Sequence, residues 1–300
     1  DAVGGLVVGW PNDPATVMGP VIEPPGSKLR AGLTELGEGE RWLLEPRPLD
    51  DSGRVWSPGI RIGVLPGSTF HQTEYFGPVL GIMRAGSLED AVRMQNGVDY
   101  GLTAGIHSLD PEEVSYWLEH VEAGNAYVNR GITGAIVRRQ PFGGWKKSSV
   151  GPTAKAGGPN YLFGLGLWKN APTESTPPAD AIPAGIERIL ELCEAHLSHD
   201  DHAFIRRAVW SDQSAWDEHF GVAVDVSALG VERNVFRYRP GVTTLRLSAF
   251  TPLAHSLRVL FAGLRTGAQI EVSTSEPLPE GIDELLLGGA AFGHGPSRIV

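Results

Sequence analysis

The first 170 residues alternate between segments with the pattern of strands and segments with the pattern of helices. Residues 60–65 and 79–84 are rich in apolar and β-branched side chains and are expected to form strands. Residues 102–107 and 126–129 give two further strands, and a helical pattern separates 79–84, 102–107 and 126–129 from one another. Strands that alternate with helices favour parallel pairing through right-handed crossovers. The sequence therefore predicts an α/β protein.

Capping residues mark two of the expected helix starts. Ser87 is followed three positions later by Asp90, an arrangement that satisfies the first free N–H groups of a helix. Asp110 precedes Pro111, whose missing N–H costs nothing at the first helical position. We expect helices to begin after Ser87 and after Asp110, with the second ending near Val121.

The segment 170–183 contains several prolines and no apolar periodicity, so we expect an extended linker. Beyond it, helices are expected at 186–195, 201–209 and 253–264, and strands at 235–238, 244–247 and 267–272. The predicted organisation is a portion of one α/β domain in 1–169, the linker in 170–183, and a truncated Rossmann-like α/β domain in 184–300. Strand-like residues stand at both termini, so we expect the chain to be part of a longer fold.

The composition excludes several classes of protein. Hydrophobic residues at 41%, charged residues at 20% and a mean hydropathy of -0.09 are typical of a soluble globular chain. A net charge of -10 disfavours nucleic-acid binding, and the best basic patch, Arg138, Arg139, Lys146 and Lys147, is more simply a solvated hairpin. No apolar run or leader pattern favours membrane insertion or export. One cysteine fits a reducing cytoplasm.

Three motifs lie in the first domain. Residues 73–79 read TEYFGPV, residues 141–146 read PFGGWK, and residues 155–159 read KAGGP. Together with DPATVMGP at 13–20 and YVNRGITG at 127–134, they resemble the aldehyde dehydrogenase superfamily. Within it they are most similar to the L-glutamate γ-semialdehyde (1-pyrroline-5-carboxylate) dehydrogenase branch, as found in bifunctional proline-utilisation enzymes.

This resemblance implies both a fold and an activity. The fold is the C-terminal part of an aldehyde dehydrogenase catalytic domain with an oligomerisation-type hairpin, followed by the Rossmann-like domain. The activity is oxidation of glutamate γ-semialdehyde to glutamate with NAD, in proline catabolism. FAD would belong to a proline dehydrogenase domain upstream of this sequence. The implied partners are the aldehyde and either further copies of the chain or upstream domains, with no nucleic acid and no membrane.

Glu74 and Phe76 are the expected cofactor-binding residues, because they match the family's Glu-x-Phe-Gly-Pro motif. There the carboxylate takes the nicotinamide-ribose hydroxyls and the ring packs beside the nicotinamide. A carboxylate suits two vicinal hydroxyls, and residues two apart share one face of a strand. The alternative is a strand-entry turn with an incidental acid and a core phenylalanine. The other motifs, all in register, favour cofactor contact.

Gly157 and Gly158 are expected to bind the substrate's α-carboxylate through backbone N–H groups, as the resemblance implies. Glycines let backbone donors approach an anion closely. The alternative is an ordinary Gly-Pro turn. Phe142 either lines the substrate tunnel or packs, and packing is favoured. Asn129 either braces the active-site floor or has a purely structural role.

The nucleophile of the reaction is missing. Aldehyde oxidation needs a thiolate, oxyanion donors, a hydride acceptor and a base. The family's cysteine precedes all three motifs, whereas Cys193 follows them, on the apolar side of a predicted helix and beside two acids expected to raise its pKa. The general base, the oxyanion asparagine and most dinucleotide-binding loops belong before Asp1. We expect no catalytic residue here and an inactive chain.

Other interpretations stay open. The complete protein could oxidise a different aldehyde, or the chain could be a short non-catalytic module for assembly or for covering a site. A metal cluster of His196, His199, Asp200, Asp201 and His202 is disfavoured, because these residues read better as a polar turn and the start of a helix. No metal is expected.

Overall fold

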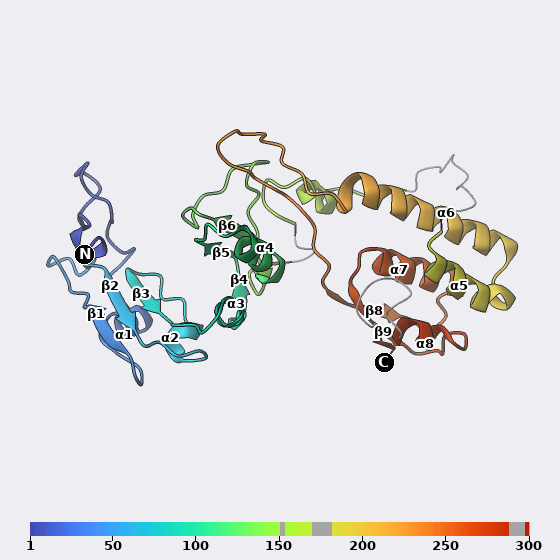
Figure 1. The fold of residues 1–300 in the computed structure, drawn as a ribbon, viewed down its shortest axis with the longest axis horizontal. Coiled ribbons are helices and arrows are strands. Elements are labelled where there is room, and N and C mark those ends of the chain that lie inside the picture. The colour runs from blue at the N-terminus through green and yellow to red at the C-terminus, as the bar shows by residue number, and fades with distance from the viewer. Residues whose placement is uncertain (151–153, 170–181, 288–297, 300) are drawn as a thin grey trace. The chain divides into compact units, whose positions relative to one another are not determined.

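The computed structural model describes residues 1–150, 154–169, 182–287 and 298–299. They fall into two compact units, Asp1–Gly164 and Leu165–Val300, coloured blue to green and green to red (Figure 1). Each unit mixes helices with strands, so the predicted α/β class is confirmed. The linker expected at 170–183 lies outside the described residues except for its last two positions. None of the described helices has the length and apolar character needed to cross a membrane.

The described strands of the first unit pair in three small sheets. Their bounds are β1 Arg41–Leu44, β2 Gly59–Ile62, β3 Val79–Ile82, β4 Tyr100–Gly101, β5 Thr103–Ile106, β6 Asn125–Val128 and β7 Trp145–Lys146. β2 pairs antiparallel with β1 and parallel with β3. β5 runs parallel to β6, and β4 runs antiparallel to β7. The strands expected at 60–65, 79–84 and 102–107 are therefore present in shorter form, and the one expected at 126–129 is present one residue earlier.

The expected parallel crossover from β5 through α4 (Pro111–His120) to β6 is present, but the one from β3 through α3 (Leu88–Asn96) to β5 is not, because β3 and β5 lie in different sheets. Apolar periodicity identifies a strand but does not specify its partner. β2 is also shorter than expected. Gly63 follows it at a φ of 81°, and a Cβ at Gly63 would collide with the Gly39 carbonyl oxygen, so the chain turns there.

Two helices of the first unit, α3 and α4, begin where the capping residues predict. The bounds of the helices in this unit are η1 Val3–Gly5, α1 Ser27–Thr34, α2 Thr69–Gln72, α3 Leu88–Asn96, α4 Pro111–His120 and η2 Tyr161–Leu165. Ser87 Oγ accepts from the Asp90 N–H at 3.2 Å, and Asp110 Oδ1 accepts from the Glu112 N–H at 2.8 Å. α3 and α4 meet over a small core that includes Val92 from α3.

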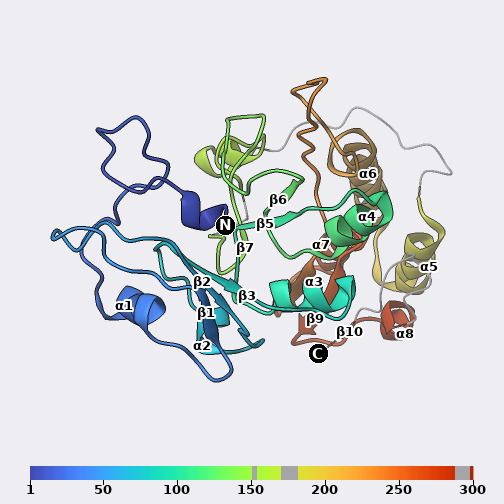
Figure 2. The same cartoon turned by 60° about the vertical axis from the view of Figure 1, so that its left-hand side comes forward.

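The second unit is built on a parallel sheet with the order β10-β9-β8. Its elements are α5 Ala184–Cys193, η3 Glu194–His196, α6 His199–Ala215, η4 Trp216–Phe220, β8 Val242–Leu247, α7 Leu253–Arg265, β9 Gln269–Thr274, α8 Ile282–Leu287 and β10 Arg298–Ile299. α7 connects β8 to β9, packs on both and contacts α6 (Figure 2). A helix between parallel neighbours is the arrangement expected of a Rossmann-like unit.

Two expectations for the second unit need correction. The strand predicted at 235–238 is absent, and Phe236 instead forms one isolated pairing with Val224. The Phe236 and Tyr238 rings pack edge to face with centroids 5.2 Å apart, so these apolar residues contact each other instead of extending the sheet. The helix predicted at 201–209 runs instead from His199 to Ala215, so the main difference is at its C-terminal end.

Candidate functional site

The glycine loop, defined here as residues 155–158, lies against the turn that contains Phe142. Phe142 and Ala156 exchange two backbone hydrogen bonds, of 3.0 and 2.9 Å. The Gly158 N–H donates to the Lys155 carbonyl at 2.8 Å, which closes a tight turn. Phe142 is therefore directly beside the loop in which the sequence predicts substrate binding.

Two glycines are required by the close approach of backbone segments around this loop. Gly157 has a φ of 73°, and a Cβ there would lie 3.0 Å from the Val137 Cα. A Cβ at Gly124 would lie 1.9 Å from the Gly143 carbonyl oxygen. The turn, the loop and the start of β6 are thus packed backbone against backbone.

The Lys155 ammonium connects these three segments. Its Nζ donates to the Gly124 carbonyl at 2.5 Å, to the Gly143 carbonyl at 2.6 Å and to Asn125 Oδ1 at 3.2 Å. Burial lowers the pKa of Lys155 to about 8. Within the residues that the structure describes, no carboxylate contacts this ammonium.

Two asparagines tie β6 to its surroundings. Asn125, at the start of the strand, donates to the Pro141 carbonyl at 3.0 Å and accepts from the Gly143 N–H at 3.2 Å. Asn129, directly after the strand, accepts from the Ser108 N–H at 2.9 Å and donates to the Ser108 carbonyl at 2.8 Å. The side-chain amide of Asn129 therefore holds the neighbouring loop at Ser108 through both of its polar groups.

Glu74 and Phe76 lie between α2 and β3, and both are exposed. Between them, the half-buried Tyr75 stacks on Phe70 with ring centroids 4.9 Å apart. Contrary to the prediction, Glu74 and Phe76 do not share one face of a strand, because residues 73–78 are not a strand and Phe76 has a φ of 57°. The motif nevertheless directs both side chains outward, with the Phe76 side chain 73% exposed and Lys28 Nζ 6.0 Å from its ring centroid.

The structure brings together some of the predicted site residues. Phe142 joins Gly157 and Gly158 in one hydrogen-bonded group. Glu74 and Phe76 flank the sheet β1-β2-β3, and among the described residues no hydrogen bond or ring contact joins them to that group.

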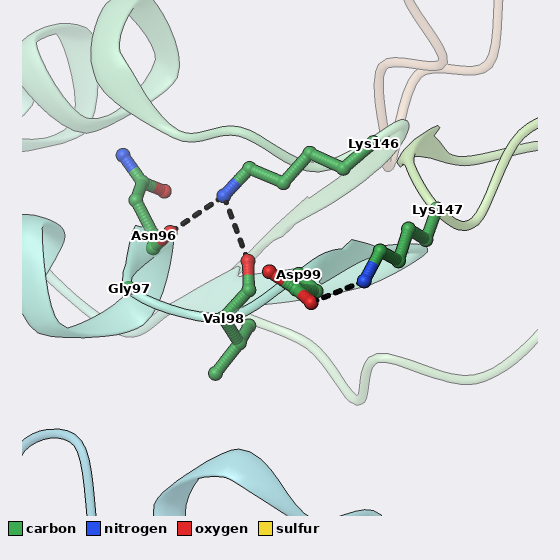
Figure 3. Close-up of a pocket in the computed structure, with 6 residues that line it drawn as sticks. All are labelled: Asn96, Gly97, Val98, Asp99, Lys146 and Lys147. Carbon is green, nitrogen blue, oxygen red and sulfur yellow. Dashed lines mark hydrogen bonds and ion pairs between the residues drawn. The ribbon is translucent and has the colours of Figure 1, made fainter.

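A separate open depression of about 470 Å³ lies where the end of α3 meets β7 (Figure 3). Lys146 Nζ donates to the Asn96 and Val98 carbonyls at 2.5 and 3.1 Å, and Lys147 pairs with Asp99 at 2.5 Å. That exposed pair lowers the pKa of Asp99 and raises that of Lys147. Both lysines are thus occupied in joining two segments, and the depression includes none of the predicted site residues.

Cys193 lies at the end of α5 with no exposed surface. The pKa of its thiol is raised to about 11, as predicted in direction, but the cause is burial and not the flanking acids. The neighbouring histidine-rich segment begins α6, where Ser198 and Asp201 form a capping box, so a helix starts in this segment as predicted, but at His199 instead of Asp201. No group of three potential ligands is placed to hold a metal ion within the described ranges.

Lys155 and Asn125 are the residues of this region that sequence reasoning missed. Lys155 lies in the motif KAGGP, for which the sequence predicts a role for the two glycines only. A long cationic side chain among small residues that are packed closely was the available signal. Asn125 offered none, because its partners are two backbone groups and the distant Lys155 ammonium.

The model of the aldehyde dehydrogenase family matches residues 1–164, more than half of the sequence. The chain belongs to the aldehyde dehydrogenase family. The family predicted from the three motifs is therefore confirmed, and so is the predicted kind of fold.

Individual relatives show which members of the family the chain is similar to. The chain is 40% identical over 159 residues to a 1-pyrroline-5-carboxylate dehydrogenase of Bacillus subtilis, and 39% identical to one of Geobacillus sp.. Each alignment covers 53% of this family member and 30% of the relative. Proline Utilization A of Corynebacterium freiburgense is 44% identical with a TM-score of 0.80, over 100% of this chain and 31% of that one. The chain thus spans about 30% of the length of these relatives.

Proposed function

We propose that this chain is the C-terminal part of an NAD-dependent dehydrogenase that oxidises L-glutamate γ-semialdehyde to glutamate in proline catabolism. The observation that carries the proposal is the glycine loop: Gly157 needs its positive φ, and the neighbouring Lys155 ammonium has no carboxylate partner among the described residues. Such a loop suits an anionic group. The relatives named 1-pyrroline-5-carboxylate dehydrogenase support this choice of substrate.

The proposed roles follow the exposure of the side chains. Glu74 and Phe76 are accessible, so they fit a ribose diol and a nicotinamide ring, and we assign them to NAD. Bound NAD supplies the hydride acceptor. Gly157 and Gly158 are assigned to the substrate's α-carboxylate, with Phe142 packed beside them. The Gly158 N–H already donates within the loop, so a carboxylate there has to share or replace that bond.

The remaining chemistry is assigned to the rest of the polypeptide. A buried thiol with a raised pKa cannot act as the nucleophile, so Cys193 has no part in the reaction. The nucleophile, the oxyanion donors and the base come from segments that the resemblance places before Asp1. An upstream FAD-dependent proline dehydrogenase domain and association of further copies complete the proposal, which the similarity to Proline Utilization A supports. A single cysteine supports a cytoplasmic setting.

The test is NAD reduction by the intact protein that carries this sequence. Glutamate γ-semialdehyde is expected to be oxidised, and Glu74→Ala is expected to raise the KM for NAD about tenfold or more, through lost hydrogen bonds to a charged group. Glu112→Ala, at an exposed acid in the first turn of α4, is the matched control and is expected to leave that KM unchanged. The 300-residue chain alone is expected to reduce no NAD.

Other outcomes decide between the alternatives. Equal oxidation of the semialdehyde and of an unrelated aldehyde would favour a different substrate. An intact protein that oxidises no aldehyde would favour the assembly or covering module. An unchanged KM for NAD in Glu74→Ala would remove Glu74 from the cofactor site.

A further inference from the structure

The Lys155 ammonium is bound by oxygen atoms from two different segments. Gly124 and Asn125 stand at the start of β6, and Gly143 stands in the turn beside the glycine loop. Hydrogen bonds from a charged donor are among the stronger ones in proteins. Three of them from one atom hold the first residue of the loop against both segments.

The positive charge of Lys155 is not neutralised by an acid among the described residues. The two nearby lysines of the depression in Figure 3 are different: Lys146 pairs with Glu122 and Lys147 with Asp99, each at 2.5 Å. Buried charges are normally paired, because an unpaired charge loses solvation without compensation. A cation that meets only neutral oxygens leaves a net positive field in its surroundings.

The loop's own hydrogen bonds transmit the position of Lys155 to both glycines. The Lys155 carbonyl accepts from the Gly158 N–H, and the Gly157 carbonyl accepts from the Arg138 N–H at 2.9 Å. Both the N–H and the carbonyl of Ala156 are hydrogen-bonded to the backbone of Phe142. Moving Lys155 therefore moves the backbone donors assigned to the substrate.

We infer that Lys155 is a positioning residue that makes the site selective for aldehydes carrying a carboxylate. Its three hydrogen bonds set the place of Gly157 and Gly158, and its uncompensated charge favours an anion at these glycines. The inference rests on the proposed function and deepens it. Lys155 acts through the loop and does not touch the substrate. Oxidation of an uncharged aldehyde is consequently independent of this side chain.

The test compares two substrates in the intact protein and in variants. Lys155→Met keeps the length and apolar stem of the side chain but removes its donors and charge. The KM for glutamate γ-semialdehyde is expected to rise about tenfold or more, since hydrogen bonds from a charged group are lost. The kcat/KM for propanal, which has no carboxylate, is expected to stay within about twofold, well under the 1.4 kcal/mol that separates a tenfold change. Lys147→Met is the matched control, expected to change neither value.

A second measurement reports on the loop without any substrate. Amide hydrogen exchange in the peptide of residues 154–160 is expected to quicken in Lys155→Met and to stay unchanged in Lys147→Met. If Lys155→Met fails to fold, Lys155→Gln, which keeps a shorter donor, is examined in the same way.

The outcomes separate the inference from the proposed function. A wild-type protein with no preference for the semialdehyde over propanal refutes the proposed function, whatever Lys155 does. Unchanged exchange in the loop, or an equal loss with both substrates, overturns the role of Lys155 even when the wild-type preference is present. A selective rise in the KM for the semialdehyde together with faster exchange supports it.

Discussion

The two units differ in what fills their interiors. In the second, the main cluster of buried hydrophobic residues among those described has seventeen members, drawn from α5, α6, α7, α8 and the sheet. In the first, the corresponding cluster around α3, α4 and β5 has five. The first unit is nevertheless the longer of the two. Apolar burial is the dominant favourable term in folding, so the two units cannot be stabilised in the same way.

The first unit contains a buried ion pair. Arg61 forms an ion pair with Glu40 in which the side chains are only 3% and 2% exposed, at an N–O distance of 2.7 Å. Its guanidinium lies 4.6 Å from the Trp42 ring centroid and 3.9 Å from that of Phe70, and donates to the Gly32 carbonyl. The free energy lost when a buried ion pair is desolvated offsets much of the attraction between its two charges.

Large apolar side chains of the first unit remain on its surface. Leu65 and Leu80 are each 54% exposed, and Leu102 is also exposed. Exposed apolar patches often mark surfaces that another element covers. Family membership over residues 1–164 does not by itself imply that this unit is stable alone. The unit that carries the family motifs has the smaller apolar core.

Separating the units gives the largest expected effect. A polypeptide of residues 182–300 is expected to unfold cooperatively, because its apolar cluster is contiguous. A polypeptide of residues 1–164 is expected to lack a sharp transition and to bind the dye ANS through its exposed apolar side chains. Circular dichroism on heating and dye fluorescence measure the two properties. A sharp transition without dye binding in 1–164 would show that its small core suffices.

The buried ion pair of the first unit gives the next effect. Arg61→Met is expected to lower the free energy of unfolding of the intact protein by about 3–5 kcal/mol, because Glu40 stays buried without its partner. Arg93→Met is the matched control: its pair with Asp90 is exposed and contributes about 0.5 kcal/mol or less. Urea titration measures both losses. Equal losses would mean that burial of the pair at Arg61 does not matter.

The next smaller effect is expected from creating a cavity in the second unit. Leu257 on α7 has no exposed surface, so Leu257→Ala is expected to lower the free energy of unfolding by about 2–5 kcal/mol. Val259 on the same helix is 49% exposed, and Val259→Ala is expected to stay within about 0.5 kcal/mol. The measurement is again urea titration. A loss below about 1 kcal/mol at Leu257 would indicate that the cluster collapses into the space left by the side chain.

Local features of the fold could be predicted from the sequence, and distant pairings could not. The helix starts at Ser87 and Asp110 depend on side chains that bond N–H groups two or three residues on, so the signal is contained in one short window. The separation of β3 from β5 depends on contacts across the whole unit. The absent strand at 235–238 has the same origin, since Phe236 and Tyr238 find aromatic partners that no periodicity reveals.

The same distinction applies to the candidate site. The motifs identified the glycine loop and the residues at 74 and 76, because their letters match a known family. The partners of Lys155 were not predictable, because two of its three acceptors are backbone carbonyls, which every residue carries. Glu40 and Arg61, twenty-one positions apart, likewise give no sign in the sequence that they meet inside the unit.

Alkaline pH is expected to change the free energy of unfolding of the two units in opposite directions. Burial lowers the pKa of Lys155 from 10.5 to about 8, so between these values the unfolded chain holds more protons and the free energy of unfolding of the first unit rises with pH. Burial raises the pKa of Cys193 from 9.0 to about 11, so in that range the unfolded chain holds fewer protons and the second unit weakens. Urea unfolding at neutral and alkaline pH, with proteolysis and mass spectrometry, follows each unit by its own peptides. Lys155→Met is expected to abolish the rise and Cys193→Ala the fall, and responses that persist in these variants would assign the pH dependence to other groups.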